Sequence, residues 1–293
     1  MVKLLAYAPS PDAPARLGVL GDNGLRELIG VGQLTELMPE VGGPDLGAPF
    51  DPSTVEVRAP IARPGKIICV GLNYHDHCRE QGIEPPAYPM LFSKFANAVA
   101  HPGQPVVRPR ATEKLDLECE LAVVIGRRAK NIGPSEAMEH VFGYTILNDV
   151  TMRDLQHEDK QWLRAKGSDG FAPMGPVVVT RDEIADPQAL RLRSYVNGMV
   201  WQDSSTAEMV FDVATIVAFV SRTITLEPGD VIATGTPAGV GHYQEPPRYL
   251  RGGDLMRCEI EGIGVLENPV VDEEPRSEDH VAAAGVSDLA KYA

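Results

Sequence analysis

The chain has 293 residues and a formal net charge of −14, from 27 Lys and Arg against 41 Asp and Glu. This acidic balance argues against a nucleic-acid partner and against binding to an anionic membrane surface, because both depend on basic side chains. Hydrophobic residues make up 43% of the chain, enough to bury a core, yet no apolar run reaches the roughly 20 residues that a membrane-spanning helix needs.

The first part of the chain predicts a small N-terminal β-rich domain. MVKLLAYAPSP is too short an apolar run, and too soon broken by proline, to be a secretory signal. Weakly alternating segments punctuated by glycine then predict short hairpin strands. The proline-rich residues 44–65 show no helical period, and we expect them to be a linker. We place this domain and its linker at residues 1–62.

Residues 63–272 differ in texture and predict a mainly β domain with a few helices. Apolar runs rich in Val and Ile, four to eight residues long, are bounded by Gly, Pro or Asp, which is typical of strands. Asn197-Gly198 between two alternating segments predicts a hairpin turn. Ser205 and Glu208 form a capping box that predicts the start of an amphipathic helix with Val213 and Val217 on its apolar face.

The remaining features of the chain concern its end and its cysteines. Residues 272–279 read DEEPRSED and open an acidic C-terminal tail, 273–293, which we expect to be disordered or loosely attached. Cys69, Cys78, Cys119 and Cys258 show neither a CxxC pair nor zinc-site spacing. We therefore expect free thiols in a reducing compartment and a cytoplasmic protein.

Two acidic motifs indicate a metal site. Glu118 and Glu120 alternate on a predicted strand, so they share a face, and two adjacent carboxylates beside a buried run need a cation. Asp149 ends another apolar run and can complete the site from a neighbouring strand. A hard divalent ion such as Mg²⁺ suits these oxygen ligands. A solvated edge strand would explain the Glu pair alone equally well.

Three further segments carry candidate active-site residues. His77 and Glu80 lie one helical turn apart, so the carboxylate can orient an imidazole base, although a solvated helix surface shows the same spacing. Lys166 precedes a loop marked by Gly and Pro, where it could clamp a carboxylate or stabilise an enolate; an ordinary surface lysine is the alternative. The loop holding Gly235 and Thr236 could bind a small carboxylate or be a plain turn, and it lacks the P-loop ending.

Seven segments in order resemble the fumarylacetoacetate hydrolase superfamily, in its acylpyruvate hydrolase and 2-hydroxyhepta-2,4-diene-1,7-dioate isomerase-like branch. The matching segments are GLNYHDHCRE, PMLFSKFANAVAHPG, LDLECELAVVIGRRAKNI, VFGYTILNDVTMRDLQ, KGSDGFAPMGPVVV, YVNGMVWQDSSTAEMVF and LEPGDVIATGTPAGVG. The resemblance implies a mixed β-sandwich roll, a homodimer, and a catalytic domain at 63–272.

The resemblance also implies roles for individual residues. It implies one Mg²⁺ or Mn²⁺ ion held by Glu118, Glu120 and Asp149, and a His–Glu dyad on a lid. The dyad matches His77 and Glu80. Positions that line the substrate pocket match Tyr74, Arg153, Gln156, Lys166, Gly235 and Thr236. Leu72 stands where fumarylacetoacetate hydrolases proper have a further Asp ligand, which argues against a fourth protein ligand and against fumarylacetoacetase activity.

These features predict an enzyme acting on a small 2-oxo or 2,4-dioxo carboxylate. The first reading is a metal-dependent hydrolase that cleaves a C–C bond of an acylpyruvate or 2,4-diketo acid through a metal-bound enolate, in the breakdown of aromatic or sugar acids. The alternative on the same platform is an oxaloacetate decarboxylase or a 2-hydroxyhepta-2,4-diene-1,7-dioate isomerase/decarboxylase. A non-catalytic oxo-acid binder is the third possibility.

Overall fold

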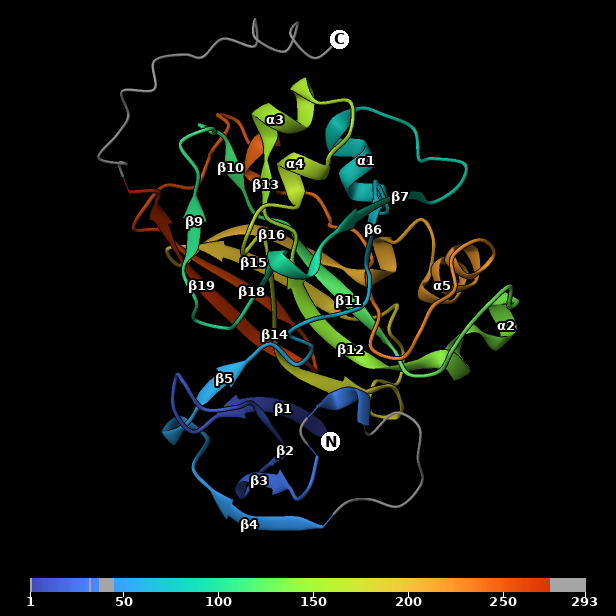
Figure 1. The fold of residues 1–293 in the computed structure, drawn as a ribbon. Coiled ribbons are helices and arrows are strands. Elements are labelled where there is room, and N and C mark those ends of the chain that lie inside the picture. Colours follow the sequence, from blue (N-terminus) through green and yellow to red (C-terminus); the bar gives the residue numbers. More distant parts are fainter. Residues whose placement is uncertain (1, 32, 37–44, 275–293) are drawn as a thin grey trace, which may run out of the picture.

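The computed structural model describes residues 2–31, 33–36 and 45–274 of the chain, and it is mainly β with few helices, as predicted (Figure 1). The strands are β1 (Lys3–Ala8), β2 (Arg16–Gly21), β3 (Gly24–Leu28), β4 (Leu46–Phe50), β5 (Glu56–Arg58), β6 (Ile67–Gly71), β7 (Met90–Lys94), β8 (Val99–Ala100), β9 (Val106–Arg108), β10 (Leu115–Asp116), β11 (Cys119–Ile125), β12 (Val141–Asn148), β13 (Thr151–Met152), β14 (Ala172–Thr180), β15 (Arg191–Val196), β16 (Met199–Ser205), β17 (Val231–Ala233), β18 (Leu255–Ile260) and β19 (Gly264–Asp272). The α-helices are α1 (His75–Gln81), α2 (Pro134–Ala137), α3 (Arg153–Glu158), α4 (Leu163–Lys166) and α5 (Val213–Ser221).

The strands form two main sheets that pack as a β-sandwich roll. The larger sheet runs β4-β3-β2-β1-β14-β12-β11-β17-β6-β7, with β5 paired to β1 and β8 paired to β14. The smaller sheet runs β16-β15-β18-β19-β9, and β10 pairs with β13. Strand β11 contacts β15 and β18, and β14 contacts β19, so the two sheets share a core. Helices α1, α3 and α4 lie together at one end of the roll (Figure 1).

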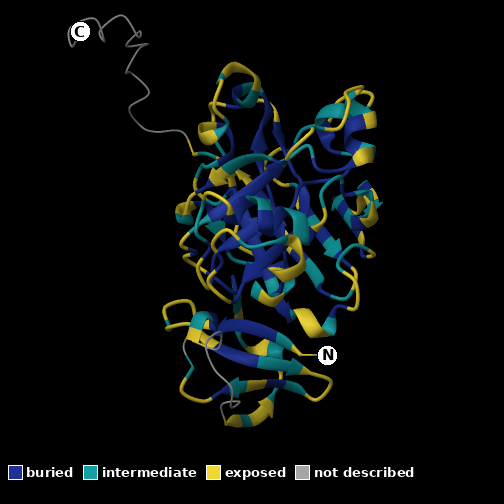
Figure 2. Ribbon diagram, turned by 90° about the vertical axis from the view of Figure 1, so that its right-hand side faces the viewer, coloured by how far each residue is buried: buried dark blue, intermediate teal, exposed yellow. Residues whose placement is uncertain are grey.

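The core lies between the sheets and beneath α5. Every residue of β11 is buried, because this strand has a sheet neighbour on each side and packed layers above and below. Leu121 and Val123 face one cluster with Ile216 of α5, and Ala122 and Val124 face a second cluster on the other side of the sheet. Figure 2 shows this buried centre against the more exposed N-terminal strands. The segment that holds Glu118 and Glu120 therefore continues directly into β11, a fully buried strand.

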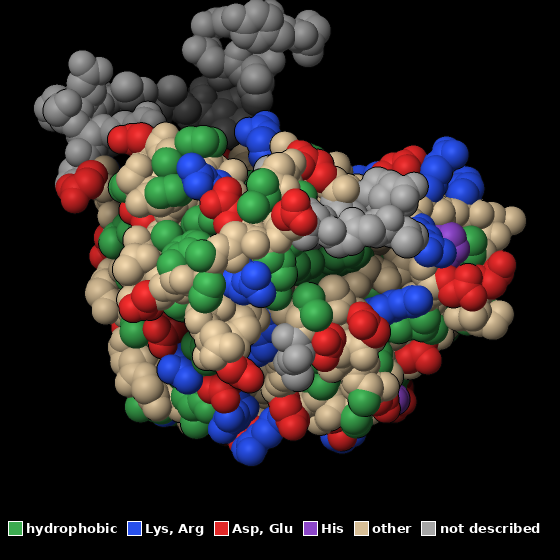
Figure 3. All heavy atoms as spheres, turned by 90° about the horizontal axis from the view of Figure 1, so that it is seen from below, with side chains coloured by type: hydrophobic (Ala, Val, Ile, Leu, Met, Phe, Trp, Pro, Cys, Tyr) green, Lys and Arg blue, Asp and Glu red, His purple; other side chains and the backbone are tan. Residues whose placement is uncertain are grey.

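The N-terminal hairpins occur as predicted, but the expected linker is partly wrong. Strands β4 and β5 lie within residues 44–65, and β5 pairs with β1 through Ala6 and Arg58. Strand β1 also pairs with β14, with Lys3 opposite Val179. Within the proline-rich segment, β5 pairs with β1, and β4, which contains Pro49, forms the edge of the sheet beside β3, a position where a strand tolerates proline. Seen from below, this end of the molecule mixes acidic and basic side chains (Figure 3).

The Asn197-Gly198 turn joins β15 to β16 as predicted. Both residues have positive φ, 52° and 79°, which a two-residue hairpin turn of this kind requires. Asn197 also bonds Asp254 through its side chain, at 2.7 Å, which ties the turn to the neighbouring β18 end.

The predicted helix start at Ser205 is wrong. Ser205 instead caps a short 3-10 turn, Thr206–Glu208, and α5 begins after Asp212, whose side chain accepts from the N–H of Thr215 at 2.7 Å. Asn73 binds the intervening chain outside a helix, because its side-chain oxygen accepts from the N–H of Phe211 and its backbone oxygen accepts from the N–H of Val210. Residues 275–293 of the expected acidic tail lie outside the described residues.

Candidate metal centre and active site

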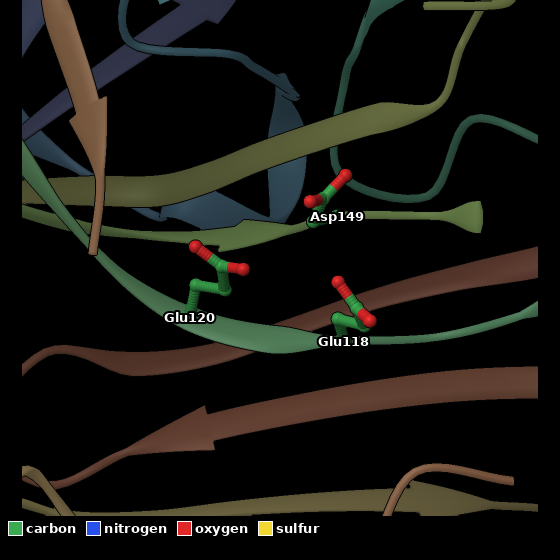
Figure 4. A group of neighbouring side chains, drawn as sticks. All are labelled: Glu118, Glu120 and Asp149. Carbon is green, nitrogen blue, oxygen red and sulfur yellow. The ribbon is translucent and has the colours of Figure 1, made fainter. Parts of the chain in front are cut away.

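Three carboxylates meet where β11 and β12 lie side by side. Antiparallel pairing places Cys119 opposite Asn148. Glu118 and Asp149, the next residues outward on the two chains, are therefore also neighbours, and the N–H of Asp149 donates to the carbonyl of Glu118 at 2.8 Å. Glu120 extends from the same face of β11 (Figure 4). One oxygen from each carboxylate lies within 4.8 Å of the others, and all three side chains are buried. The structure thus brings the predicted acidic residues together.

Two buried lysines contact this triad. The Nζ atom of Lys166 lies 2.8 Å from Glu118 Oε2 and 2.7 Å from Asp149 Oδ2. The Nζ atom of Lys94 lies 2.6 Å from Asp149 Oδ1 and donates to the carbonyl oxygens of Val150 and Phe171. Sequence reasoning missed Lys94, although a lysine at the end of the apolar strand β7 already required a buried partner.

The charge of the triad is unevenly balanced. Burial opposes ionisation of Glu118, but Arg153, whose Nη2 lies 2.7 Å from Oε1, and Lys166 outweigh it and lower the pKa of Glu118. Glu120 differs, because burial and the charges of Asp149 and Glu118 raise its pKa well above the usual range. Its side-chain contact is the N–H of Gly235, at 2.8 Å. Within the described residues, Glu120 forms no ion pair.

This donor set suits a hard divalent cation. The carboxylates of Glu118, Glu120 and Asp149 offer oxygen ligands of the kind that such ions prefer. In its ionised form, the buried Glu120 carboxylate has no ion-pair partner among the described basic side chains. A bound cation would supply the missing positive charge. Leu72, where a further Asp ligand was considered, lines the adjacent cavity with φ 51° and offers no ligand atom.

The predicted His–Glu pair is formed on α1. His77 Nδ1 lies 2.8 Å from Glu80 Oε2, and Glu80 Oε1 accepts from the N–H of Gly239 at 2.8 Å. Each oxygen of Glu80 therefore has a partner, and the carboxylate holds both the imidazole and the glycine-rich loop. His77 lines the cavity together with Glu118 and Glu120, and Nε2 is the ring nitrogen that does not contact Glu80.

A cavity of about 160 Å³ is lined by Glu118 and Glu120 of the triad and by His77 of the dyad, whereas Asp149 and Glu80 are not among its lining residues. Of the predicted substrate-binding residues, Arg153, Gln156, Lys166 and Thr236 line it. The other lining residues are Val70, Gly71, Leu72, His77, Gln81, Phe92, Glu118, Glu120, His157, Trp162 and Tyr243. Tyr74 does not line this cavity: it is fully buried within the main hydrophobic core. Gly235 is absent from the lining as well, and its contact with the site is the N–H bond to Glu120.

Asp116 is a further buried residue of the site that sequence reasoning did not assign. Its Oδ2 accepts from Arg153 Nε at 2.9 Å, and its two oxygens accept from the N–H groups of Gly241 and His242 at 2.9 and 3.0 Å. Asp116 therefore fixes Arg153 against Glu118 and holds the loop that carries Tyr243. Asp116 ends β10, two residues before Glu118, and this repeat of the acidic spacing in the sequence was the available signal.

The model of the fumarylacetoacetate (FAA) hydrolase C-terminal domain matches residues 66–271. The chain belongs to the fumarylacetoacetate hydrolase family. It is 48% identical over 221 residues to the mitochondrial oxaloacetate tautomerase fahd2 of Xenopus laevis, covering 75% of this chain and 69% of that protein. The mitochondrial oxaloacetate tautomerase FAHD2A of Homo sapiens is also 48% identical, over 75% and 70% of the two chains.

Solved structures of family members resemble the whole chain. The fumarylacetoacetate hydrolase of Exiguobacterium antarcticum superposes with a TM-score of 0.85 at 42% identity, over 93% of this chain and all of that one. A 2-hydroxyhepta-2,4-diene-1,7-dioate isomerase from Mycobacterium marinum superposes at 0.79 and 37% identity, over 94% of this chain and all of that one. In the described residues, no helix is long and apolar enough to cross a bilayer.

Proposed function

We propose that this family member is a divalent-metal-dependent enzyme that interconverts the enol and keto forms of a small 2-oxo dicarboxylate such as oxaloacetate. The observation that carries the proposal is one small cavity lined by Glu118 and Glu120 of the carboxylate triad and by His77, which Glu80 contacts from outside the lining. Relatives named oxaloacetate tautomerases, and a structural neighbour named a dienedioate isomerase, support proton transfer over hydrolysis. This favours the isomerase side of the alternatives considered from the sequence.

The proposed metal is Mg²⁺ or Mn²⁺, held by Glu118, Glu120 and Asp149. When bound, such an ion supplies Lewis acidity that makes a carbon next to a 2-oxo group easier to deprotonate. The chain's own contribution begins with charge. Arg153 is held by Asp116 and Lys166 by Asp149, so both cations stand fixed beside the place where a substrate carboxylate and its 2-oxo oxygen would lie.

His77 is the proposed proton carrier. Glu80 accepts a hydrogen bond from Nδ1–H of His77, which leaves Nε2 with a lone pair facing the cavity. In the keto-to-enol direction, Nε2 takes the proton from the carbon next to the 2-oxo group and then gives it to the 2-oxo oxygen, so the imidazole ends neutral. In the reverse direction the same proton moves back, so no other reactant is required.

The remaining residues position the substrate. Gln156 and Thr236 line the cavity and are proposed to hold its carboxylate oxygens. Thr236 is itself fixed, because Gln202 donates to its Oγ1 at 2.7 Å and Thr236 donates to the carbonyl of Cys119. Gly235 acts indirectly, through Glu120. We expect a cytoplasmic homodimer; light scattering of the purified protein measures its assembly.

Hydrolysis of an acylpyruvate is the second candidate, because an imidazole oriented by a carboxylate can also deprotonate water. One experiment separates the candidates: proton NMR in D₂O with Mg²⁺ and either oxaloacetate or an acylpyruvate. Tautomerisation exchanges the hydrogens next to the 2-oxo group at an enzyme-dependent rate and keeps the carbon skeleton. Release of pyruvate and a second acid from the acylpyruvate, without faster exchange of oxaloacetate, would overturn the proposal in favour of hydrolysis.

A further inference from the structure

Two histidines, His157 and His242, face one another where the cavity wall reaches the protein surface, and we call this place the mouth of the cavity. His157 comes from α3 and is exposed, whereas His242 comes from a 3-10 turn, Gly241–Tyr243, and is half-buried. Their Nε2 atoms lie 3.2 Å apart, and their ring centroids lie 5.0 Å apart. His157 also lines the cavity that Glu118 and Glu120 line. Nothing in the proposed proton transfer uses this pair.

His242 is held in the orientation that points Nε2 at His157. Its Nδ1 atom lies 2.9 Å from the hydroxyl oxygen of Tyr249, and its backbone N–H donates to Asp116 at 3.0 Å. Its ring also packs edge-on against Tyr243 at 4.8 Å. A hydrogen bond on the far ring nitrogen is the usual way in which proteins orient a histidine that binds a metal.

The separation of the two Nε2 atoms suits one shared ion. Zinc–nitrogen bonds are about 2.0–2.1 Å long, so two nitrogens on one tetrahedral ion lie about 3.3–3.4 Å apart. The neutral imidazole is the form that binds metal, and burial, Arg153 and His157 lower the pKa of His242. Arg153 is paired with Asp116 and Glu118, and Asp116 acts on His242 in the opposite sense to Arg153, which offsets part of the repulsion that Arg153 exerts on a cation here.

We propose that His157 and His242 form a second metal site, which takes a borderline transition ion such as Zn²⁺ and leaves two positions for water. The site is chemically distinct from the triad, since imidazole suits Zn²⁺ and oxygen ligands suit Mg²⁺. An ion bound here would lie beside the part of the cavity that His157 lines, where it would hinder entry of the substrate. The site therefore makes the enzyme sensitive to Zn²⁺ even when Mg²⁺ is in excess.

Binding is tested with Co²⁺, a coloured substitute for Zn²⁺, added to the full chain in excess Mg²⁺. We expect visible absorption of a nitrogen-ligated ion in the wild type, displaced by Zn²⁺, and at least about a tenfold weaker affinity in His157→Asn. His157 is exposed, so this variant keeps the fold, and His242→Asn provides an independent test. His140→Asn, which changes a histidine away from the cavity, is the matched control and should bind like the wild type.

Glu118→Gln separates this site from the triad. The absorption should persist in Glu118→Gln, and isothermal titration with Zn²⁺ should show the same loss in His157→Asn in either background. In turnover assays, half-inhibition by Zn²⁺ should shift upward at least about tenfold in His157→Asn. Unchanged Co²⁺ binding in both histidine variants, or its complete loss in Glu118→Gln alone, would overturn the proposal.

Discussion

The inner end of the cavity and its mouth handle charge in different ways. At the inner end, Glu118 and Asp149 are buried and neutralised by lysines and Arg153 at 2.6–2.8 Å. At the mouth, His157 is exposed and Gln156 is half-buried, and their side-chain contacts are with His242 and Arg153 rather than with a buried carboxylate. Because the charges at the inner end are buried, losing one partner of an ion pair there destabilises the fold. A substitution at the mouth leaves no buried charge unpaired and should cost little stability.

The largest expected effect comes from removing a ligand at the inner end. Glu118→Gln should weaken Mg²⁺ or Mn²⁺ binding by more than about a hundredfold and turnover by about a thousandfold. Isothermal titration and an oxaloacetate tautomerisation assay measure the two effects. Glu139→Gln, an exposed position on the other side of the molecule, is the control. Unchanged metal affinity in Glu118→Gln would show that the triad is not the metal site.

The second largest effect is expected from the His77–Glu80 dyad, because His77 is the proposed proton carrier. His77→Asn should lower kcat by about a hundred- to ten-thousandfold while metal affinity stays the same. Glu80→Gln keeps the size of the side chain but weakens the orientation of the imidazole, so its loss should be smaller, about tenfold to a hundredfold. Full turnover in His77→Asn would remove His77 from the mechanism.

A stability comparison within the triad sharpens the charge argument. In EDTA at neutral pH, Glu120→Gln should raise the free energy of unfolding by about 1–3 kcal/mol, because it removes a buried carboxylate that lacks an ion pair. Asp149→Asn should lower it by about 3–5 kcal/mol, since Lys94 and Lys166 lose their partner. Urea denaturation measures both. Destabilisation of equal size in the two variants would contradict the uneven balance of charge.

The raised pKa of Glu120 also sets the pH dependence of that stability. As pH rises, the unfolded chain releases this proton near its usual value of about 4.3, while the folded chain still holds it. The stabilising contribution is therefore complete below the unfolded pKa and is lost as pH rises through the folded value. In EDTA, wild-type stability should fall with pH over this window more steeply than that of Glu120→Gln.

The smallest effect is expected at Tyr74. Because its side chain lies in the core and not on the cavity wall, Tyr74→Phe should change KM by no more than about twofold and the free energy of unfolding by about 1 kcal/mol or less. Steady-state kinetics and urea denaturation test this. A tenfold rise in KM would restore the role in substrate binding that the sequence suggested.

The sequence predicted those parts of the site that a local pattern defines. The spacing of Glu118 and Glu120 fixes a shared strand face, and the spacing of His77 and Glu80 fixes a helical neighbour pair, so both arrangements followed from periodicity. Lys94 lies in a different segment and reaches Asp149 through tertiary packing. No local pattern could place it there.

The same local patterns predicted much of the fold. The prediction was wrong where tertiary contacts determine the position of a helix or strand. The hairpin at Asn197-Gly198 depends on the turn alone and was predicted correctly. Ser205 has a good capping sequence, but Asn73 binds the N–H groups of Val210 and Phe211 after it, and the helix begins at Val213. The strands within residues 44–65 were missed because their partners are distant in the chain: β5 pairs with β1, about 50 residues earlier, and β4 pairs with β3, about 20 residues earlier.

The pairing of β1 with β14 limits how the chain can be divided. Strand β14 carries residues of the central core, and Leu4 of β1 lies opposite its Val178. A fragment starting at residue 63 would expose the backbone N–H and C=O groups of β14 as an unprotected sheet edge, a known template for aggregation. Any shorter version of this enzyme must therefore keep its first strand, or replace it with another that satisfies β14.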